Sequence, residues 1–197
     1  MRKVIVSNLV SLDGFFDGPN RELDWFVVEE EFFEYAKELL RSVDTILFGR
    51  ITYEGMASYW PTPAAADNDP TITHKMNNLS KIVFSKTLST VDPIVIGWNN
   101  SKLVKGNIAE EIRKMKEEAG KDMVIFGSGS IVSALTRFGL IDEYRIIVNP
   151  VILGKGNPLF KDLQDKFNLE LVKTKTLKSG VVIFYYQPDK KLSAVKN

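Results

Sequence analysis

The stretch VIFGSGSIV at residues 124–132 decides how this chain folds. A short apolar run leads into alternating glycine and serine, and a second apolar run follows at once. This order predicts a buried strand, a tight turn at Gly127–Ser130, and a helix over 131–138 that ends at Gly139. A strand that opens directly into a helix is typical of α/β folds with parallel strands.

The pattern repeats on both sides of this stretch. Apolar runs predict strands at 4–12, 45–48, 81–85 and 94–96, and helices are predicted at 29–41, 52–58 and 108–119. Toward the C-terminus, a strand is predicted at 144–149 and a hairpin from 169–176 and 181–187. The segment 61–74 holds three prolines and predicts a long surface loop. We therefore expect one domain over 1–188, with a mostly parallel sheet and an antiparallel C-terminal edge, and a charged tail over 189–197.

Composition excludes several kinds of chemistry. The 197 residues include no cysteine and only one histidine, His74, which excludes disulfides, thiolate-zinc sites and histidine-cluster metal sites. A net charge of +1 gives no reason to expect nucleic acid or a membrane as partner. The sequence shows no signal peptide or bilayer-spanning run, so a cytoplasmic location is expected. An enzyme of this composition would take its reactive group from a cofactor, and no metal is expected.

The glycine-serine turn is also a candidate phosphate site. The first amides of a helix have no partner inside the helix, and the helix dipole adds positive charge there. Glycines let a phosphate or pyrophosphate approach, and Ser128 and Ser130 add hydroxyl groups. The alternative interpretation is that the glycines only form the turn and that Ser130 only caps the helix.

Two further turns follow predicted strands. Gly49, Arg50 and Thr52 lie where a strand meets a helix start, and an arginine at that position is suited to bind phosphate. Ser85 and Lys86 follow another strand and are suited to a terminal phosphate, such as the 2′-phosphate of NADP. Each has a simpler alternative, a solvated side chain or a helix cap, but a dinucleotide would use all the turns together.

The end of the first strand and the proline-rich segment are candidates for the substrate side. Asp13 is suited to orient a substrate or to relay a proton, and Gly14 lets a flat ring approach the backbone. An ordinary Asp-Gly turn is the alternative. Trp60 and the segment 61–74 are expected to cover the substrate, whereas His74 is expected to be a solvated residue.

Taken in order, these segments resemble the dihydrofolate reductase-like superfamily, and within it the RibD C-terminal family, the reductase domain of bacterial riboflavin biosynthesis. The resemblance covers about 2–187 and is carried by SLDG at 11–14, FGRITYE at 48–54, SKTL at 85–88, FGSGS at 126–130, and DEY at 142–144 leading to PVILG at 150–154. It implies a three-layer α-β-α fold that binds NADPH across the carboxyl ends of the central strands. The expected catalytic residue is Asp13, the expected substrate residues are Asp13 and Trp60, and the expected cofactor-binding residues are Gly14, Gly49, Arg50, Thr52, Ser85, Lys86, Gly127, Ser128, Gly129, Ser130 and Ile131.

The chain departs from the riboflavin enzymes on the substrate side. Ser7 stands where they tend to carry a lysine, Phe126 stands where they carry a glutamate, and there is no deaminase domain. We therefore expect a stand-alone NADPH-dependent reductase of a small heterocyclic, carbonyl or imine substrate that resembles the 5-amino-6-(5-phosphoribosylamino)uracil reductase. The alternatives are a non-catalytic NADP(H)- or nucleotide-binding module and a binder of a phosphorylated metabolite. The hairpin near 181–186 suggests a homodimer. Gly129→Val is expected to abolish cofactor binding without unfolding the domain.

Overall fold

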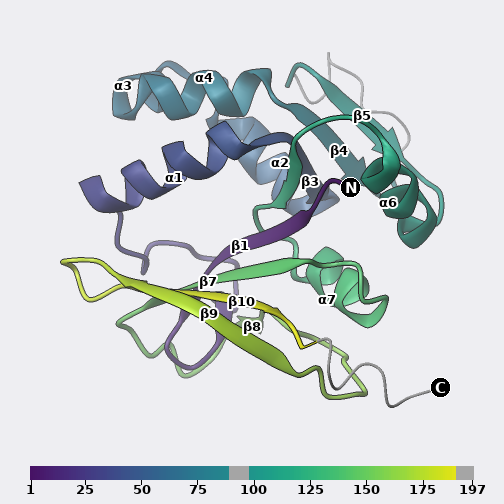
Figure 1. Ribbon diagram of the computed structural model, residues 1–197. Coiled ribbons are helices and arrows are strands. Elements are labelled where there is room, and N and C mark those ends of the chain that lie inside the picture. The colour runs from purple at the N-terminus through teal and green to yellow at the C-terminus, as the bar shows by residue number, and fades with distance from the viewer. Residues whose placement is uncertain (89–97, 190–197) are drawn as a thin grey trace.

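The computed structural model describes residues 1–88 and 98–189. In this part of the chain, eight strands form one sheet in the order β5-β4-β3-β6-β1-β7-β10-β9 (Figure 1). In that order the strands span β5 (Ser101–Val104), β4 (Ser80–Phe84), β3 (Val43–Gly49), β6 (Asp122–Ile125), β1 (Val4–Ser11), β7 (Glu143–Asn149), β10 (Val182–Pro188) and β9 (Leu169–Thr176). All pairs from β5 to β7 are parallel, whereas β10 is antiparallel to both β7 and β9.

Helices cover both faces of this sheet, as a mostly parallel sheet requires (Figure 1). One face carries α1 (Glu30–Ser42), α2 (Arg50–Tyr59), α3 (Pro63–Asn68) and α4 (Pro70–Asn78). The other face carries α6 (Ile108–Glu117) and α7 (Gly129–Arg137). The buried side chains accordingly form two clusters, one with α1, α2 and α4 and one with α6 and α7. The expected three-layer α-β-α architecture with an antiparallel C-terminal hairpin is confirmed.

The proline-rich segment is not the expected loop. It forms α3 and α4, and each of these helices has a proline in its first turn. Thr62 caps α3 by accepting from the Ala65 amide, and Asp69 caps α4 by accepting from the amides of Thr71 and Ile72. Proline is compatible with the first helical turn, where its missing N–H leaves no bond unmade, so prolines that suggested a loop instead mark two helix starts.

Two predicted segments fall outside the described part of the chain, and two further features of the sheets were not expected. The strand expected at 94–96 lies outside the described residues, as does the tail from 190 onward. Strand β5, which the sequence did not suggest, forms one edge of the sheet. A small second sheet pairs β2 (Phe15–Asp17) with β8 (Asn157–Pro158).

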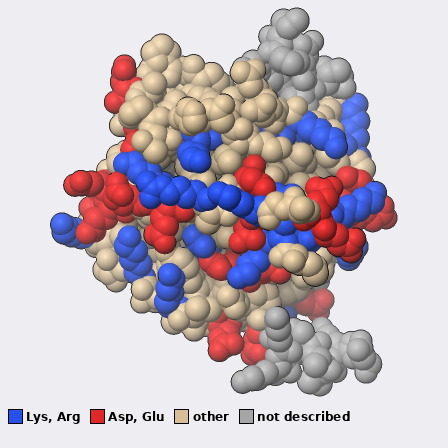
Figure 2. All heavy atoms as spheres, turned by 45° about the horizontal axis from the view of Figure 1, so that its top comes forward, with Lys and Arg blue, Asp and Glu red and all other residues tan. Residues whose placement is uncertain are grey.

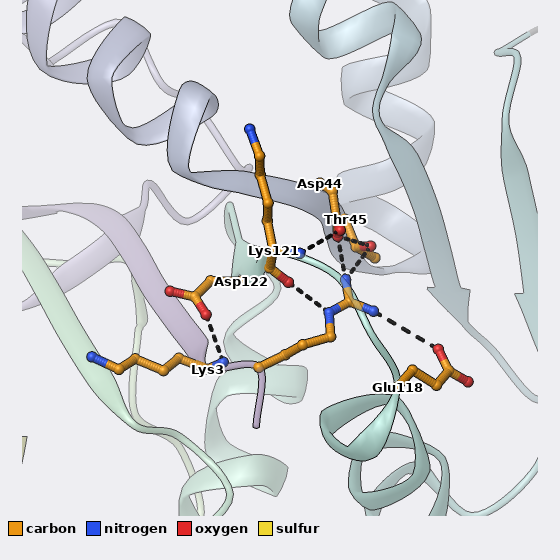
Figure 3. Close-up of polar contacts among 7 residues, drawn as sticks. Lys3, Asp44, Thr45, Glu118, Lys121 and Asp122 are labelled. Atoms are coloured by element: carbon orange, nitrogen blue, oxygen red, sulfur yellow. Dashed lines mark hydrogen bonds and ion pairs between the residues drawn. The ribbon is translucent and has the colours of Figure 1, made fainter.

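The amino-terminal rim of the sheet is held by a network around Arg2, whose side chain is buried (Figure 3). Its guanidinium forms an ion pair with Asp44 and donates to Thr45 Oγ1 at 2.8 Å and to the carbonyl of Lys121 at 2.6 Å. Glu118, at the end of α6, lies 3.8 Å from the same guanidinium. The network therefore connects β1, β3, β6 and α6 at the rim opposite the candidate phosphate turns.

At the opposite, carboxyl rim, strand β6 stops before the strands on either side of it. Strand β6 is short: its pairing ends at Ile125, opposite Val6 on one side and Leu47 on the other. Strand β1 continues beside β7 as far as the pair Ser11–Asn149. Between the later part of β1 and the end of β3 the chain turns at Phe126 and Gly127, and the side chains of Phe16 and Thr52 pack against Gly127.

Candidate functional site

The sequence-predicted turns lie at this carboxyl rim. Gly49 ends β3, Ser85 follows β4, Gly127 follows β6, and Asp13 follows β1. Since these four strands are parallel members of one sheet, their carboxyl ends share an edge. Gly49 and Phe84 are paired neighbours, which places the Ser85 turn next to the Gly49 turn.

Ser128 joins two of these turns directly. Its Oγ accepts a hydrogen bond from the Gly49 amide at 2.7 Å and donates one to Thr52 Oγ1 at 3.1 Å. Ser128 has φ +70°, a left-handed conformation that costs a non-glycine residue about 1–2 kcal/mol. These bonds occupy the Ser128 hydroxyl, so in this arrangement it holds the site together rather than standing free as the phosphate donor that the sequence suggested.

Two helices begin at the joined turns. α2 begins at Arg50 and α7 begins at Gly129, so the positive ends of both dipoles lie beside the Ser128–Thr52 contact. The amides of Ile131 and Val132 bond to the Ser128 carbonyl. The amides of Gly129 and Ser130 precede them in the first turn and have no acceptor within the helix. A diphosphate placed here would receive donors from two helix starts.

Gly129 has a second, structural reason to be glycine. A Cβ at this position would lie 3.1 Å from the Leu159 carbonyl oxygen and 3.5 Å from that of Pro158. Gly129→Val would therefore disturb the packing of α7 against 158–159 whether or not a ligand binds. This variant does not separate loss of binding from loss of structure, contrary to its expected use.

The two cationic candidates are differently placed. Arg50 forms an ion pair with Glu54 one helical turn later, at 3.1 Å, and both side chains are more than two-fifths exposed. Lys86 is exposed in the turn after β4, where Ser85 Oγ accepts from the amides of Thr87 and Leu88. Arg50 would therefore have to break its ion pair with Glu54 before it could bind a ligand. Lys86 lies in a turn that the hydrogen bonds to Ser85 Oγ already hold in place.

Asp13 holds a loop. Its carboxylate accepts hydrogen bonds from Ser11 Oγ at 2.7 Å, from the Leu153 amide at 3.1 Å and from the Gly154 amide at 2.8 Å. The bond from Ser11, above all, lowers the pKa of Asp13, with further contributions from the two amides. Asp13 is therefore ionised at neutral pH, which suits it to accept hydrogen bonds and not to supply a proton.

The face of the rim below α1 and α2 is lined by apolar residues. Leu9, Phe126, Met56 and Trp60 are partly buried against the core on this side. The Trp60 indole N–H points to Met56 Sδ at 3.1 Å, which fixes the ring relative to α2.

The polar groups nearby are engaged with the protein. Ser7 Oγ and Tyr35 Oη are 2.8 Å apart and both are buried. Glu31 accepts from the Lys178 amide, and Glu29 accepts from Ser179 at the turn between β9 and β10. The glutamates at the start of α1 therefore hold the hairpin turn.

Sequence reasoning missed Asn8. It lies in β1, is 1 % exposed, and its Oδ1 accepts from the Gly127 amide at 2.8 Å. The signal was present, because Asn8 follows Ser7 within an otherwise apolar strand and a buried amide needs partners.

Neither the charge on the face shown in Figure 2 nor the acidic and histidine side chains of the described residues suggest a different site. Lysines and arginines alternate with aspartates and glutamates over the face shown in Figure 2 and form no single-sign field there. In residues 1–88 and 98–189, no group of three histidine or acidic side chains is placed to hold a metal ion. No helix in these ranges is long and apolar enough to cross a bilayer.

Comparison with known proteins agrees with the fold. The family model described as the RibD C-terminal domain matches residues 2–183. Two Bacillus subtilis proteins, the uncharacterized proteins YyaP and YwjB, are 35 % and 30 % identical over 185 residues each. These alignments cover 94 % of this chain and 94 % of YyaP, and 93 % of this chain and 97 % of YwjB.

Solved structures are similar as well. A putative riboflavin biosynthesis protein from Shewanella sp. PV-4 superposes with a TM-score of 0.74 at 24 % identity, covering 95 % of this chain and 99 % of that one. A diaminohydroxyphosphoribosylaminopyrimidine deaminase/5-amino-6-(5-phosphoribosylamino)uracil reductase from Thermotoga maritima gives 0.66 at 14 % identity. That alignment covers 95 % of this chain but 57 % of the Thermotoga chain.

Proposed function

Because the chain belongs to the RibD C-terminal domain family, we propose that it is an NADPH-dependent reductase of a small heterocyclic, carbonyl or imine substrate. The observation that carries the proposal is the meeting of two helix starts, α2 and α7, at one rim, joined through Ser128. Two adjacent helix starts match the two adjacent phosphates of a dinucleotide.

The residues present fit this cofactor. The amides of Gly129 and Ser130, with the first turn of α2 and the Thr52 hydroxyl, would hold the pyrophosphate. Ser85 and Lys86 in the neighbouring turn would hold the 2′-phosphate. When bound, NADPH supplies hydride. The protein supplies a rim that holds cofactor and substrate together, so that the transfer becomes effectively intramolecular.

The substrate side supports a flat and uncharged acceptor. Leu9, Phe126 and Trp60 provide apolar surface. Asp13, ionised and fixed by the 153–154 loop, would orient a donor group of the substrate at the mouth of the site. Asp13 is also the catalytic residue of this proposal: hydrogen bonds lower the pKa of its carboxyl group, so the carboxylate would accept and relay a proton and not serve as its first source.

Titration with NADPH tests the cofactor half. The chain has three tryptophans, and Trp60 is expected to lose fluorescence when the dinucleotide binds. We expect saturable quenching and a rise in melting temperature that NADH produces only at higher concentration. The proposal is overturned if millimolar NADPH produces no quenching and no change in melting temperature.

A non-catalytic NADP(H)-binding module is the second candidate. It is favoured by the engagement of Ser7 with Tyr35 and of Glu29 and Glu31 with the hairpin, which leaves these groups occupied. NADPH oxidation against pterins, pyrimidines, quinones and small carbonyls separates the two functions. Turnover of any class supports the reductase, and tight binding without oxidation across the panel supports the module.

A further inference from the structure

In the side-chain amide of Asn8, the oxygen has a hydrogen-bond partner, whereas the nitrogen has none among the described residues. Its Oδ1 accepts from the Gly127 amide at 2.8 Å, which fixes the orientation of the side chain because an N–H requires an oxygen acceptor. The Nδ2 group is buried and, among the described residues, has no hydrogen-bond partner. An unpaired buried donor costs about 1–3 kcal/mol, so its presence needs an explanation.

The position of Asn8 supplies that explanation. Pairing between β1 and β6 ends at Val6–Ile125, so Asn8 lies where β1 continues without β6 beside it. Its side chain bridges the gap to the turn from which α7 begins. The unpaired Nδ2 belongs to the same amide as the oxygen bonded to Gly127, so it lies next to the turn that is the candidate pyrophosphate site.

Neighbouring side chains pack against the α-carbon of Gly127. A Cβ at Gly127 would lie 2.9 Å from the Phe16 ring and 2.9 Å from Thr52 Cγ2. Phe16 belongs to β2, a three-residue strand whose only described sheet partner is the two-residue β8. A ligand that reaches Gly127 has to replace or displace this ring, and such a movement breaks few sheet hydrogen bonds.

We infer that Asn8 is a cofactor-positioning residue: Oδ1 sets the Gly127 turn and Nδ2 donates to an oxygen of the bound dinucleotide. This inference rests on the proposed function and adds a donor from β1 to those of the two helix starts. The acceptor is either a pyrophosphate oxygen or the carboxamide oxygen of the nicotinamide, because both are oxygen acceptors carried to this rim.

Asn8→Asp tests the inference because it keeps an acceptor for the Gly127 amide and replaces the Nδ2 donor with an oxygen. This oxygen also carries negative charge, so the uncharged variant Asn8→Leu is measured beside it. We expect the Kd for NADPH to rise at least tenfold, measured by tryptophan quenching. Asn8→Leu, which removes both groups, should also lower the melting temperature. The dinucleotide fragment 2′-phospho-ADP-ribose identifies the acceptor: loss of affinity for both ligands assigns the pyrophosphate, and loss for NADPH alone assigns the carboxamide.

A measurement on the unmodified chain covers the case in which Asn8→Asp does not fold. In ¹⁵N-labelled protein, the Asn8 side-chain NH₂ resonances should shift and exchange more slowly as NADPH is added. If the wild-type chain binds NADPH while Asn8→Asp binds it equally well, or while the Asn8 NH₂ resonances stay unchanged, the inference is overturned. If the wild-type chain binds no NADPH, the proposed function fails first, so the two failures are distinguishable.

Discussion

Arg50 is held by the protein at the position where a ligand would use it. Its guanidinium faces Glu54 along the exposed side of α2, at 3.1 and 3.3 Å. An exposed pair of this kind contributes little, about 0.3–0.5 kcal/mol, because water and salt screen it. The competition between Glu54 and a phosphate is therefore weak, and it is open to measurement.

Glu54→Gln should strengthen NADPH binding by roughly two- to fivefold, because it frees Arg50 and removes a negative charge near the phosphates. The Kd from fluorescence titration at low ionic strength measures the effect, which should shrink in 0.5 M salt. Arg50→Gln is the matched control and should weaken binding. Unchanged affinity in both variants would show that Arg50 does not reach the cofactor.

Lys86→Ala should lower the preference for NADPH over NADH by about tenfold, which corresponds to about 1.4 kcal/mol. The reason is that Lys86 is the exposed cation of the turn after β4, and only NADPH carries the 2′-phosphate. The ratio of the two Kd values is the measurement. Lys75→Ala, a change in α4, provides a control with the same loss of charge. A ratio that falls equally in both variants would place the 2′-phosphate elsewhere.

For single residues, the sequence predicted which ones lie at the carboxyl rim but not which hydrogen bonds they make. Gly49, Thr52 and Ser128 were singled out from local patterns, and the structure brings them together. The occupation of the Ser128 hydroxyl and the use of Asp13 to hold 153–154 depend on contacts between segments about 80 and 140 positions apart. Such contacts follow from the fold and leave no mark in a local pattern.

Among the elements, α2 and α7 act as a pair because one side chain connects their first turns. Ser128→Ala removes the acceptor for the buried Gly49 amide and the donor to Thr52, and it keeps the left-handed strain at position 128. We expect it to lower the free energy of unfolding by about 1–3 kcal/mol and to weaken NADPH binding. Urea denaturation and fluorescence titration measure the two effects.

Ser128→Gly is the control for the strain. Glycine adopts φ +70° without cost, so this variant should recover about 1 kcal/mol relative to Ser128→Ala while the two hydrogen bonds stay lost. Equal stability of wild type and both variants would contradict the structural role of the hydroxyl.

Element types were predictable wherever an apolar period was long. The strands at 4–11 and 169–176 and the helix at 30–42 lie close to their predicted bounds. Helices α3 and α4 were missed because their prolines were taken as breakers, although Thr62 and Asp69 stand in capping positions just before them. Strand β5 has four residues and two of them are polar, so it lacks the apolar run that marked the equally short β6.

Across the whole molecule, the two rims of the sheet differ in how their polar groups are used. The amino-terminal rim is closed by Arg2 and its partners, which satisfy one another across four elements (Figure 3). At the carboxyl rim two helices begin side by side, and the Asn8 Nδ2 is buried without a hydrogen-bond partner in residues 1–88 and 98–189. Changes at the first rim are therefore expected to alter stability alone. Changes at the second rim are expected to alter binding and, where they remove a hydrogen bond as Ser128→Ala does, stability as well.

Lys81 belongs to the first rim, at the start of β4, and is fully buried without a carboxylate partner in the described residues. Its Nζ donates to the carbonyls of Asn77 and Leu79 at 2.9 Å and of Asn99 at 3.0 Å, and lies 4.6 Å from the centre of the Trp98 ring. Burial lowers the pKa of Lys81 to about 8, and the carbonyls and ring oppose this effect only in part.

The pH dependence of unfolding follows from this lowered pKa. Above pH 8 the folded chain releases the Lys81 proton while the unfolded chain, with an ordinary lysine pKa of about 10.4, still holds it, so the free energy of unfolding should rise with pH. Between pH 8 and 9.5 we expect a rise of about 1–2 kcal/mol.

Above that range the buried tyrosines lower the free energy of unfolding as the pH rises, because burial raises the pKa of Tyr35 and Tyr144 and the unfolded chain ionises first. Urea denaturation at half-unit steps provides the curve, and Lys81→Met should remove the rise while leaving the NADPH Kd unchanged. A flat wild-type curve would show that the three carbonyls keep Lys81 charged, and a change in the Kd would show that the two rims are coupled.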